Sequence, residues 1–331
     1  MNPELKISFS GKNVLVTGGL GFIGSNLVHC LAQLGARVVV VDSLIPEYGG
    51  NPFNLDGLDG KVRINIADMR DPHCISYLVQ EQDYIFNLAG QVSHLDSMKD
   101  PLTDLEINCR AQVSLLEACR RLSRPPKLVF ASTRQIYGRP QYLPVDEKHP
   151  VLPVDPNGIN KMAGEYYHLL YSELHGVKAC SLRLTNTYGP RMRVRDARQT
   201  FIGWWFRQIV RGEEILVYGD GEQQRDLNFI DDVVEAFLLA AVSPNSAGEV
   251  FNLGSEPISL KALACLLVEL NGKGSFKLVP FPDDRKAIDI GTYRGDYSKI
   301  KRVLGWEPRT PLRQGLLSSV EYYRQHGEKY W

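Results

Sequence analysis

The chain has 331 residues, of which 44% are hydrophobic and 23% charged, a composition typical of a globular protein with a large core rather than of a disordered one. Its 38 Lys and Arg balance its 38 Asp and Glu, which argues against nucleic acid or a membrane as partner. Any anionic ligand must therefore be held by a local cluster of cations.

The cysteines and the N-terminal stretch indicate a cytoplasmic protein. Six cysteines are scattered without a CxxC pair or a metal-ligand spacing, so we expect reduced thiols and no metal site. The N-terminal residues lack the pattern of a signal peptide, and no apolar run approaches the roughly 18 residues of a membrane span.

Short β-branched runs alternate with helical patterns through the first half of the chain. We expect strands at residues 13–19, 36–43, 61–68, 83–90, 127–133 and 178–186, and helices at 22–33, 71–80, 102–123 and 160–175. Several of the strands are apolar nearly throughout, as in a sheet covered on both faces. Regular alternation of strand and helix predicts an α/β fold with a doubly wound parallel sheet.

The pattern changes after residue 186. A basic loop with four arginines (188–199) is followed by a helix, a strand at 214–221, and further helices that continue to the end of the chain. We therefore predict a first domain over 1–185 and a smaller, mainly helical lobe over 186–331. Because no flexible linker separates them, we expect the boundary to be interleaved rather than clean.

A glycine-rich turn follows the first expected strand. Gly18, Gly21 and Gly24 form a GxxGxxG pattern that continues into the first helix, with Phe22 and Ile23 between the last two glycines. Such glycines let the backbone turn tightly and approach a pyrophosphate, whose charge the helix N-terminus stabilises. The context predicts a Rossmann-type dinucleotide site.

The second strand ends at Asp42, 24 residues after Gly18, where a carboxylate can bind both hydroxyls of an adenosine ribose. A carboxylate would repel a 2′-phosphate, which favours NAD over NADP, although Arg37 and Ser43 leave NADP open. The site would also include residues that follow the third and fourth strands: Asp68, Met69, Leu88, Ala89 and Gly90. Asp68 can meet the adenine amino group or serve only as a surface turn or helix cap.

Together these motifs resemble the extended short-chain dehydrogenase/reductase family, in its branch of nucleotide-sugar epimerases and dehydratases. The resemblance covers nearly the whole chain and includes ASTRQIYG at 131–138, Lys161, RLTNTYGPR at 183–191 and YGDGEQQRDLNFIDDVVEA at 218–236. It implies NAD as cofactor and a nucleotide-diphosphate sugar as substrate.

The family pattern assigns roles to individual residues. Ser132 and Thr133 end a strand at the active site, where Thr133 takes the place of the residue that hydrogen-bonds the reacting hydroxyl of the sugar. Lys161 resembles the lysine that binds the nicotinamide ribose.

The resemblance also implies three residues that bind the diphosphate of the substrate. Asn186, Arg225 and Arg285 occupy the matching positions. Two guanidinium groups that converge suit a diphosphate, because each offers a planar fork to phosphate oxygens. Surface salt bridges with neighbouring aspartates are the alternative for both arginines.

The position four residues before Lys161, where the family keeps a catalytic tyrosine, holds Asn157. An amide can orient a hydroxyl but cannot take its proton, whereas a phenol titrates. Arg134 and Gln135 stand where related dehydratases carry acidic and basic groups, so standard dehydration is disfavoured. Other candidates for proton transfer are Lys161 itself, His94, Asp96, Tyr137 and Tyr142.

Three functions remain open from the sequence. One is a UDP-glucose 4-epimerase-like enzyme with a non-standard proton-transfer group, and another is a different nucleotide-sugar redox enzyme such as a reductase, decarboxylase or atypical dehydratase. A catalytically silent NAD or nucleotide-sugar binding protein is the third. Family members commonly dimerise through two helices, here 102–123 and 160–175, which predicts a homodimer.

Overall fold

The computed structural model describes residues 3–282 and 289–331. Within them, seven parallel strands form one sheet in the order β10-β6-β5-β4-β1-β2-β3. Their bounds are β1 Asn13–Thr17, β2 Arg37–Asp42, β3 Val62–Ile66, β4 Tyr84–Asn87, β5 Lys127–Thr133, β6 Ala179–Leu184 and β10 Val250–Asn252. The predicted doubly wound parallel sheet is therefore confirmed.

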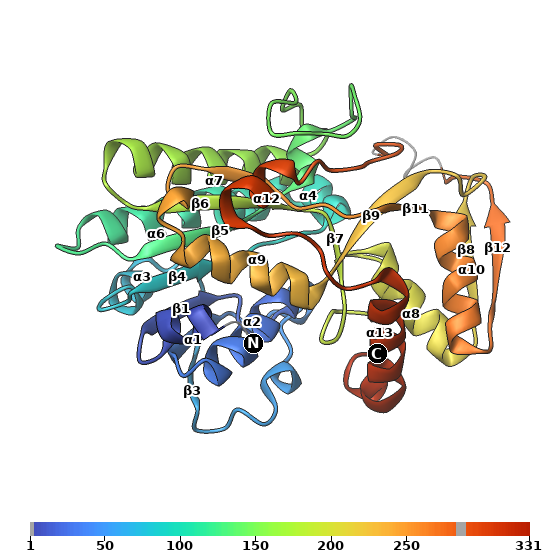
Figure 1. The fold of residues 1–331 in the computed structure, drawn as a ribbon, viewed down its shortest axis with the longest axis horizontal. Coiled ribbons are helices and arrows are strands. Elements are labelled where there is room, and N and C mark those ends of the chain that lie inside the picture. Colours follow the sequence, from blue (N-terminus) through green and yellow to red (C-terminus); the bar gives the residue numbers. More distant parts are fainter. Residues whose placement is uncertain (1–2, 283–288) are drawn as a thin grey trace.

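Helices cover both faces of this sheet (Figure 1). One face carries α1 (Pro3–Phe9), α2 (Phe22–Gln33) and α9 (Ile230–Val242), and the other carries α3 (Pro72–Leu78), α6 (Ala111–Arg120) and α7 (Pro156–Leu174). Successive residues of β1 point to opposite sides, so that Val14 and Val16 join the first core and Leu15 the second. Burial on both faces explains why these strands are apolar nearly throughout.

A second lobe lies beside the sheet (Figure 1). Its helices α8 (Phe201–Arg211), α10 (Leu260–Asn271) and α13 (Leu312–His326) pack on one another. Two small sheets complete it: β7 (Asn186–Tyr188), β9 (Gln224–Phe229) and β11 (Pro257–Ser259) in one, and β8 (Glu214–Tyr218) with β12 (Ser275–Val279) in the other. The helix α12 (Ser298–Leu304) lies near β10.

The chain returns from this lobe to the large sheet. The strand β10 pairs with β6, and α9 packs on β5, although both follow residue 186. The expected helix at 102–123 is also more complex, since it consists of α5 (Pro101–Leu105), a π-helical turn at Glu106–Arg110, and α6. A short helix α4 (His94–Lys99) precedes it.

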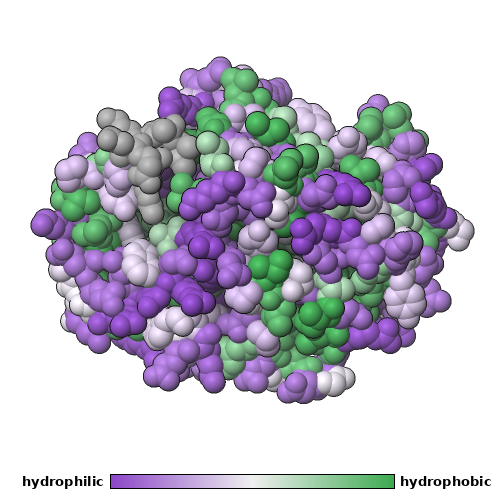
Figure 2. Space-filling view, turned by 180° about the vertical axis from the view of Figure 1, so that it is seen from behind, coloured by the Kyte–Doolittle hydropathy of each residue, from purple (hydrophilic) through white to green (hydrophobic). Residues whose placement is uncertain are grey.

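A helix that spans a membrane needs both sufficient length and apolar character. Across residues 3–282 and 289–331, no helix is both long and apolar enough to cross a bilayer. From behind, hydrophobic residues are scattered among hydrophilic ones rather than gathered into a continuous band (Figure 2).

Candidate functional site

A cavity of about 290 Å³ opens at the carboxyl ends of β1, β4, β5 and β6 and extends to the beginning of the second lobe. It brings together most of the residues predicted from the sequence. These are Gly18, Gly21, Phe22, Ile23, Gly24, Asp42, Met69, Leu88, Ala89, Gly90, Ser132, Thr133, Arg134, Asn157, Lys161 and Asn186. Asp68, His94 and Arg225 are not among the lining residues, and Arg285 lies outside the described part of the chain.

The glycine turn is built by close approach of the backbone. Gly18 has a φ of +69°, and a Cβ at this position would lie 2.9 Å from the backbone nitrogen of Ala89. A Cβ at Gly24 would lie 2.2 Å from the carbonyl oxygen of Gly18. A side chain at Gly18 or Gly24 would therefore clash with the neighbouring backbone and close the concave turn that lines the cavity.

Asp42 is held at the other side of this turn. Its Oδ2 accepts a hydrogen bond from the backbone nitrogen of Leu20 (2.9 Å) and its Oδ1 from that of Leu44 (2.8 Å). Burial raises the pKa of this carboxyl, and the two backbone donors oppose the shift. The remaining lone pairs of the carboxylate are available to ribose hydroxyls.

Asp68 is engaged elsewhere. Its carboxylate accepts three hydrogen bonds from the Arg70 guanidinium, at 2.6 to 3.0 Å, and this contact lowers its pKa. The neighbouring Met69 lines the cavity instead. A role of Asp68 at the adenine stays a prediction.

Thr17 fixes the segment that passes beside the glycine turn. Its hydroxyl donates to Asn87 Oδ1 and accepts from the backbone nitrogens of Leu88 and Ala89, all at 3.0 Å. This bridge between β1 and β4 places the small residues Ala89 and Gly90 against the cavity.

Asn157, expected in place of the tyrosine, anchors a buried polar network. Its Nδ2 lies 2.8 Å from the Gln91 carbonyl, 3.0 Å from Gln91 Oε1 and 2.9 Å from Asp104 Oδ2. Asn160 Nδ2 donates to the other oxygen of Asp104 at 2.8 Å. All four side chains are buried, so two amides satisfy a carboxylate that would otherwise be costly to bury.

Lys161 reaches the cavity from the same helix. It is buried, its Nζ donates to the Ala131 carbonyl at 3.2 Å, and the ammonium lies 5.1 Å from the centre of the Phe130 ring. Burial lowers the pKa of Lys161 to about 8, although the charge of Asp104 opposes this shift. A neutral amine is thus accessible near neutral pH.

His94 lies behind the cavity wall. Its Nδ1 is hydrogen-bonded to Asp155 Oδ2, and its Nε2 lies 2.5 Å from Nε2 of Gln135, which does line the cavity. Burial raises the pKa of Asp155, but the contact with His94 outweighs it and the net shift is downward. With Nδ1 protonated toward Asp155, Nε2 accepts from Gln135, so both ring nitrogens are engaged.

The other proton-transfer candidates lie outside the cavity lining. The Tyr137 hydroxyl donates to Asn252 and accepts from Arg183, and burial raises its pKa to about 12. Tyr142 is exposed and donates to Asp146, while Asp96 lies 3.6 Å from Arg198. None of these groups is placed to meet a ligand in the cavity.

Two arginines lie where the sheet meets the second lobe. Arg134 lines the cavity, and its Nη2 donates to Asn186 Oδ1 at 3.4 Å. Arg225 is held by the carbonyls of Gln224 and Gly291 and by an ion pair of 3.4 Å with Asp289. Burial lowers the pKa of Arg225 to about 10, and the nearby charge of Arg134 adds to the shift.

The comparisons with known proteins agree with this geometry. Residues 14–254 match the NAD dependent epimerase/dehydratase family. The chain belongs to this family.

Its relatives within the family include a UDP-glucose 4-epimerase of Mycolicibacterium smegmatis, 32% identical over 95% of this chain and 99% of that protein. A UDP-glucuronic acid decarboxylase of Xenopus tropicalis is 32% identical over 96% of this chain and 73% of its own length. The crystal structure of Thermotoga maritima UDP-glucose 4-epimerase with UDP-glucose has a TM-score of 0.85 at 33% identity and covers 95% of this chain and 99% of that chain.

NAD is the cofactor of this family, and the residues present fit it. The turn at Gly18 to Gly24 is concave only because no Cβ fills it, and the Asp42 carboxylate faces the same cavity. Gly90 likewise makes room, since a Cβ there would lie 2.7 Å from Lys161 Nζ.

In the described residues, no group of three or more His, Cys, Asp or Glu could hold a metal ion.

Several lining residues were missed from the sequence. They are Ile45, Tyr48, Gly50, Val92, Ala131, Leu184, Thr185, Thr187, Gln199 and Thr200. Some of them, such as Tyr48 and Gly50, lie in the loop after β2, and loops at the carboxyl ends of parallel strands are where ligands bind. Gln199 and Thr200 instead precede α8 and carry no local signal.

Proposed function

We propose that the protein is an NAD-dependent nucleotide-sugar 4-epimerase, similar to UDP-glucose 4-epimerase, that oxidises the sugar transiently with a non-standard proton-transfer group. One observation carries the proposal: a single cavity holds the glycine turn and Asp42 together with Thr133 and Lys161. A bound cofactor and a sugar hydroxyl would therefore meet beside Lys161.

Bound NAD supplies a hydride acceptor that can return the hydride to either face of the oxidised sugar carbon. Thr133 would orient the reacting hydroxyl. Its Oγ1 already accepts from the backbone nitrogen of Gln135 at 3.2 Å, which leaves its own proton free to donate. With its oxygen held in this way, the hydroxyl would donate its proton to the substrate.

Lys161 would move the proton. As a neutral amine, its Nζ takes the proton of the sugar hydroxyl, and as an ammonium it gives the proton back when the hydroxyl is restored. Asn157 cannot share this role, because its Nδ2 is committed to Gln91 and Asp104 and does not titrate. His94 would need Gln135 to move before its Nε2 could reach the cavity.

The diphosphate of the substrate would lie at the junction with the second lobe. Asn186 lies at this junction and donates a hydrogen bond from its Nδ2 to the Asp226 carbonyl oxygen at 3.2 Å. Arg225 would contribute a buried guanidinium. Arg285 stays a predicted partner of the same group. A charge-assisted contact of this kind fixes the nucleotide while the sugar is free to turn.

NMR spectra of the protein incubated with UDP-, GDP-, CDP- and dTDP-sugars test the proposal. We expect interconversion of two sugars that differ at carbon 4, without net consumption of NAD or NADH. Net oxidation or reduction, or release of carbon dioxide, would instead show another redox reaction, which the 32% identity to a UDP-glucuronic acid decarboxylase keeps as the second candidate. Thermal stabilisation by the sugars without turnover would indicate a binding protein.

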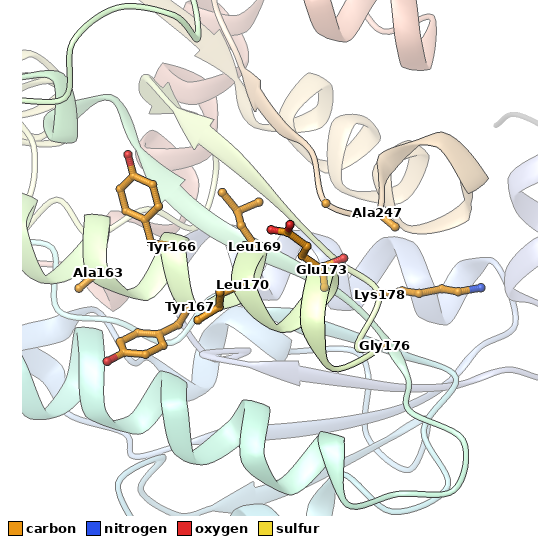
Figure 3. Close-up of a pocket in the computed structure, with 11 residues that line it drawn as sticks. Ala163, Tyr166, Tyr167, Leu169, Leu170, Glu173, Gly176, Lys178 and Ala247 are labelled. Atoms are coloured by element: carbon orange, nitrogen blue, oxygen red, sulfur yellow. The ribbon is translucent and has the colours of Figure 1, made fainter.

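We also propose a homodimer formed through the outer face of α7. An apolar groove of about 970 Å³ lies there, lined by Tyr166, Tyr167, Leu169 and Leu170 and ending near Ala247 (Figure 3). Leu174, near the end of this helix, is 63% exposed. Burial of such side chains against a second copy would remove a large apolar surface from water.

Light scattering on the eluting protein tests the dimer. We expect a mass near 74 kDa, twice the 37.2 kDa of one chain. Leu170→Asp should give a monomer, whereas Leu317→Asp, at a 37% exposed position of α13, should not. A monomeric wild type would refute this part of the proposal.

A further inference from the structure

We propose that the sugar of the substrate carries a carboxylate, as in a nucleotide-linked hexuronic acid, and that Arg134 binds this group. The inference rests on the proposed function for the position of the sugar, and it narrows the substrate class. It is carried by a half-buried arginine, with its Nη1 fully buried, that lines the cavity without an ion-pair partner in the described residues.

Arg134 is poorly satisfied where it stands. Across residues 3–282 and 289–331, its buried Nη1 has no hydrogen-bond partner, and the one hydrogen bond of its Nη2 is a long one of 3.4 Å to Asn186 Oδ1. The guanidinium lies 4.9 Å from the centre of the Tyr293 ring, which stabilises the cation but supplies no acceptor. Since arginine stays charged, a guanidinium removed from water without a paired anion is destabilising, and a bound anion would stabilise Arg134.

Two described carboxylates act on the charge of Arg134, those of Asp226 and Asp289, and both already have other partners. Asp226 accepts from the Thr185 hydroxyl with Oδ1 and from the backbone nitrogen of Gly295, at 2.9 Å, with Oδ2. The second, Asp289, is shared. It pairs with Arg225 at 3.4 Å and accepts from the Gly291 backbone nitrogen at 3.2 Å. Arg134 interacts with both aspartates only over a longer distance.

Its place in the chain points to the sugar rather than to the nucleotide. Arg134 directly follows Thr133, the residue proposed to hold the reacting hydroxyl at carbon 4. In a hexuronic acid the carboxylate is attached to carbon 5, the ring neighbour of carbon 4. A carboxylate there would lie within reach of a side chain from the next residue after Thr133.

A carboxylate also suits the geometry of the Arg134 guanidinium. Among the described residues, one long hydrogen bond holds the guanidinium, so the planar fork can turn toward the cavity and bind two carboxylate oxygens in parallel. Arg225, by contrast, is fixed by two carbonyls and an ion pair, so its guanidinium is less free to turn. The diphosphate is the other anion that Arg134 could meet, and it is the competing outcome of the test.

Calorimetric titration of the NAD-loaded protein with UDP-glucuronate, UDP-glucose and UDP distinguishes the two anions. We expect wild type to bind UDP-glucuronate at least tenfold more tightly than UDP-glucose. Arg134→Gln should remove this preference while it changes the affinity for UDP less than threefold. Arg134→Lys should keep part of the preference, because it retains the charge but loses the fork. Arg121→Gln, at an exposed arginine, is the control and should behave like wild type.

The ligand series makes the outcomes separable. Equal weakening of all three ligands by Arg134→Gln would assign Arg134 to the diphosphate and overturn the inference. The inference would also be overturned if the wild-type protein bound UDP-glucuronate no more tightly than UDP-glucose. This comparison does not depend on whether any variant folds. Because calorimetry reports binding whether or not the ligand is converted, selective binding of UDP-glucuronate by a protein that does not epimerise it would refute the proposed function alone.

Discussion

The two ends of the cavity are built by different means. At the cofactor end, backbone meets backbone, as where a Cβ on Gly24 would lie 2.2 Å from the Gly18 carbonyl. At the substrate end, side chains from separate elements hold one another, as Asn157 does with Asp104 and His94 with Asp155. The first end depends on the absence of side chains, whereas the second depends on which side chains are present.

This difference suggests how such a fold can change its chemistry. A backbone turn has few alternatives, because any Cβ blocks it. A side-chain network can exchange several members together, provided that each buried polar atom keeps a partner. Changes at the two ends of the cavity should therefore differ in size and in kind.

The largest effect is expected at the glycine turn. Gly24→Val should weaken NAD binding more than a hundredfold in calorimetry, since the new side chain clashes with Gly18 and Gly19. Gly60→Ala is the control, because Gly60 also has a positive φ, of +70°, but open space around it. That variant should lose about 1 kcal/mol of stability and keep its NAD affinity. Near-normal binding by Gly24→Val would contradict the close approach.

The second-largest effect is expected when the proposed base, Lys161, is removed. Lys161→Met should lower turnover by about 10² to 10⁴-fold. In the wild type, kcat/KM should rise tenfold per pH unit up to about 8 and then level off, because the amine must be neutral and burial lowers its pKa to that value. Lys148→Met, at an exposed lysine, should leave both unchanged. If Lys161→Met still turns over, the His94 pair becomes the candidate.

Restoring a tyrosine should not restore an ordinary site. Asn157→Tyr should destabilise the protein by about 2 to 4 kcal/mol, because the ring overpacks a buried position and Asp104 loses a donor. Denaturant unfolding measures the change. Ile159→Tyr, at a 49% exposed position of the same helix, should alter stability by less than about 0.5 kcal/mol. A stable, more active Asn157→Tyr would show that the network is dispensable.

The smallest effect concerns the charge behind Lys161. Asp104 raises the pKa of this lysine against the effect of burial, so Asp104→Asn should move the rise of kcat/KM to lower pH. Asp100→Asn is the control, since Asp100 is exposed and asparagine can still cap α5. A pH profile that does not move in Asp104→Asn would mean that Lys161 is not the titrating group.

Local patterns predicted much of the fold and the cofactor end. The alternation of apolar strands and helices identified the parallel sheet, and α2 has the expected bounds, 22–33. The glycine turn, Asp42 and Lys161 all line the cavity, and each could be located in the sequence because it lies at a fixed offset from its own strand or helix. The return of β10 to the large sheet was not foreseen, since a three-residue strand paired with a distant one leaves little local pattern.

The contacts at the substrate end do not follow from local patterns. The sequence placed Asn157, Arg134 and Gln135 near the substrate, but it gave no hint that Asn157 would bind Asp104, 53 residues earlier. Nor did it pair His94 with Asp155, 61 residues later. Short offsets along one element fix the backbone turn and so can be read from the chain itself. Contacts between side chains of different elements depend on how those elements pack, and only the tertiary structure decided them.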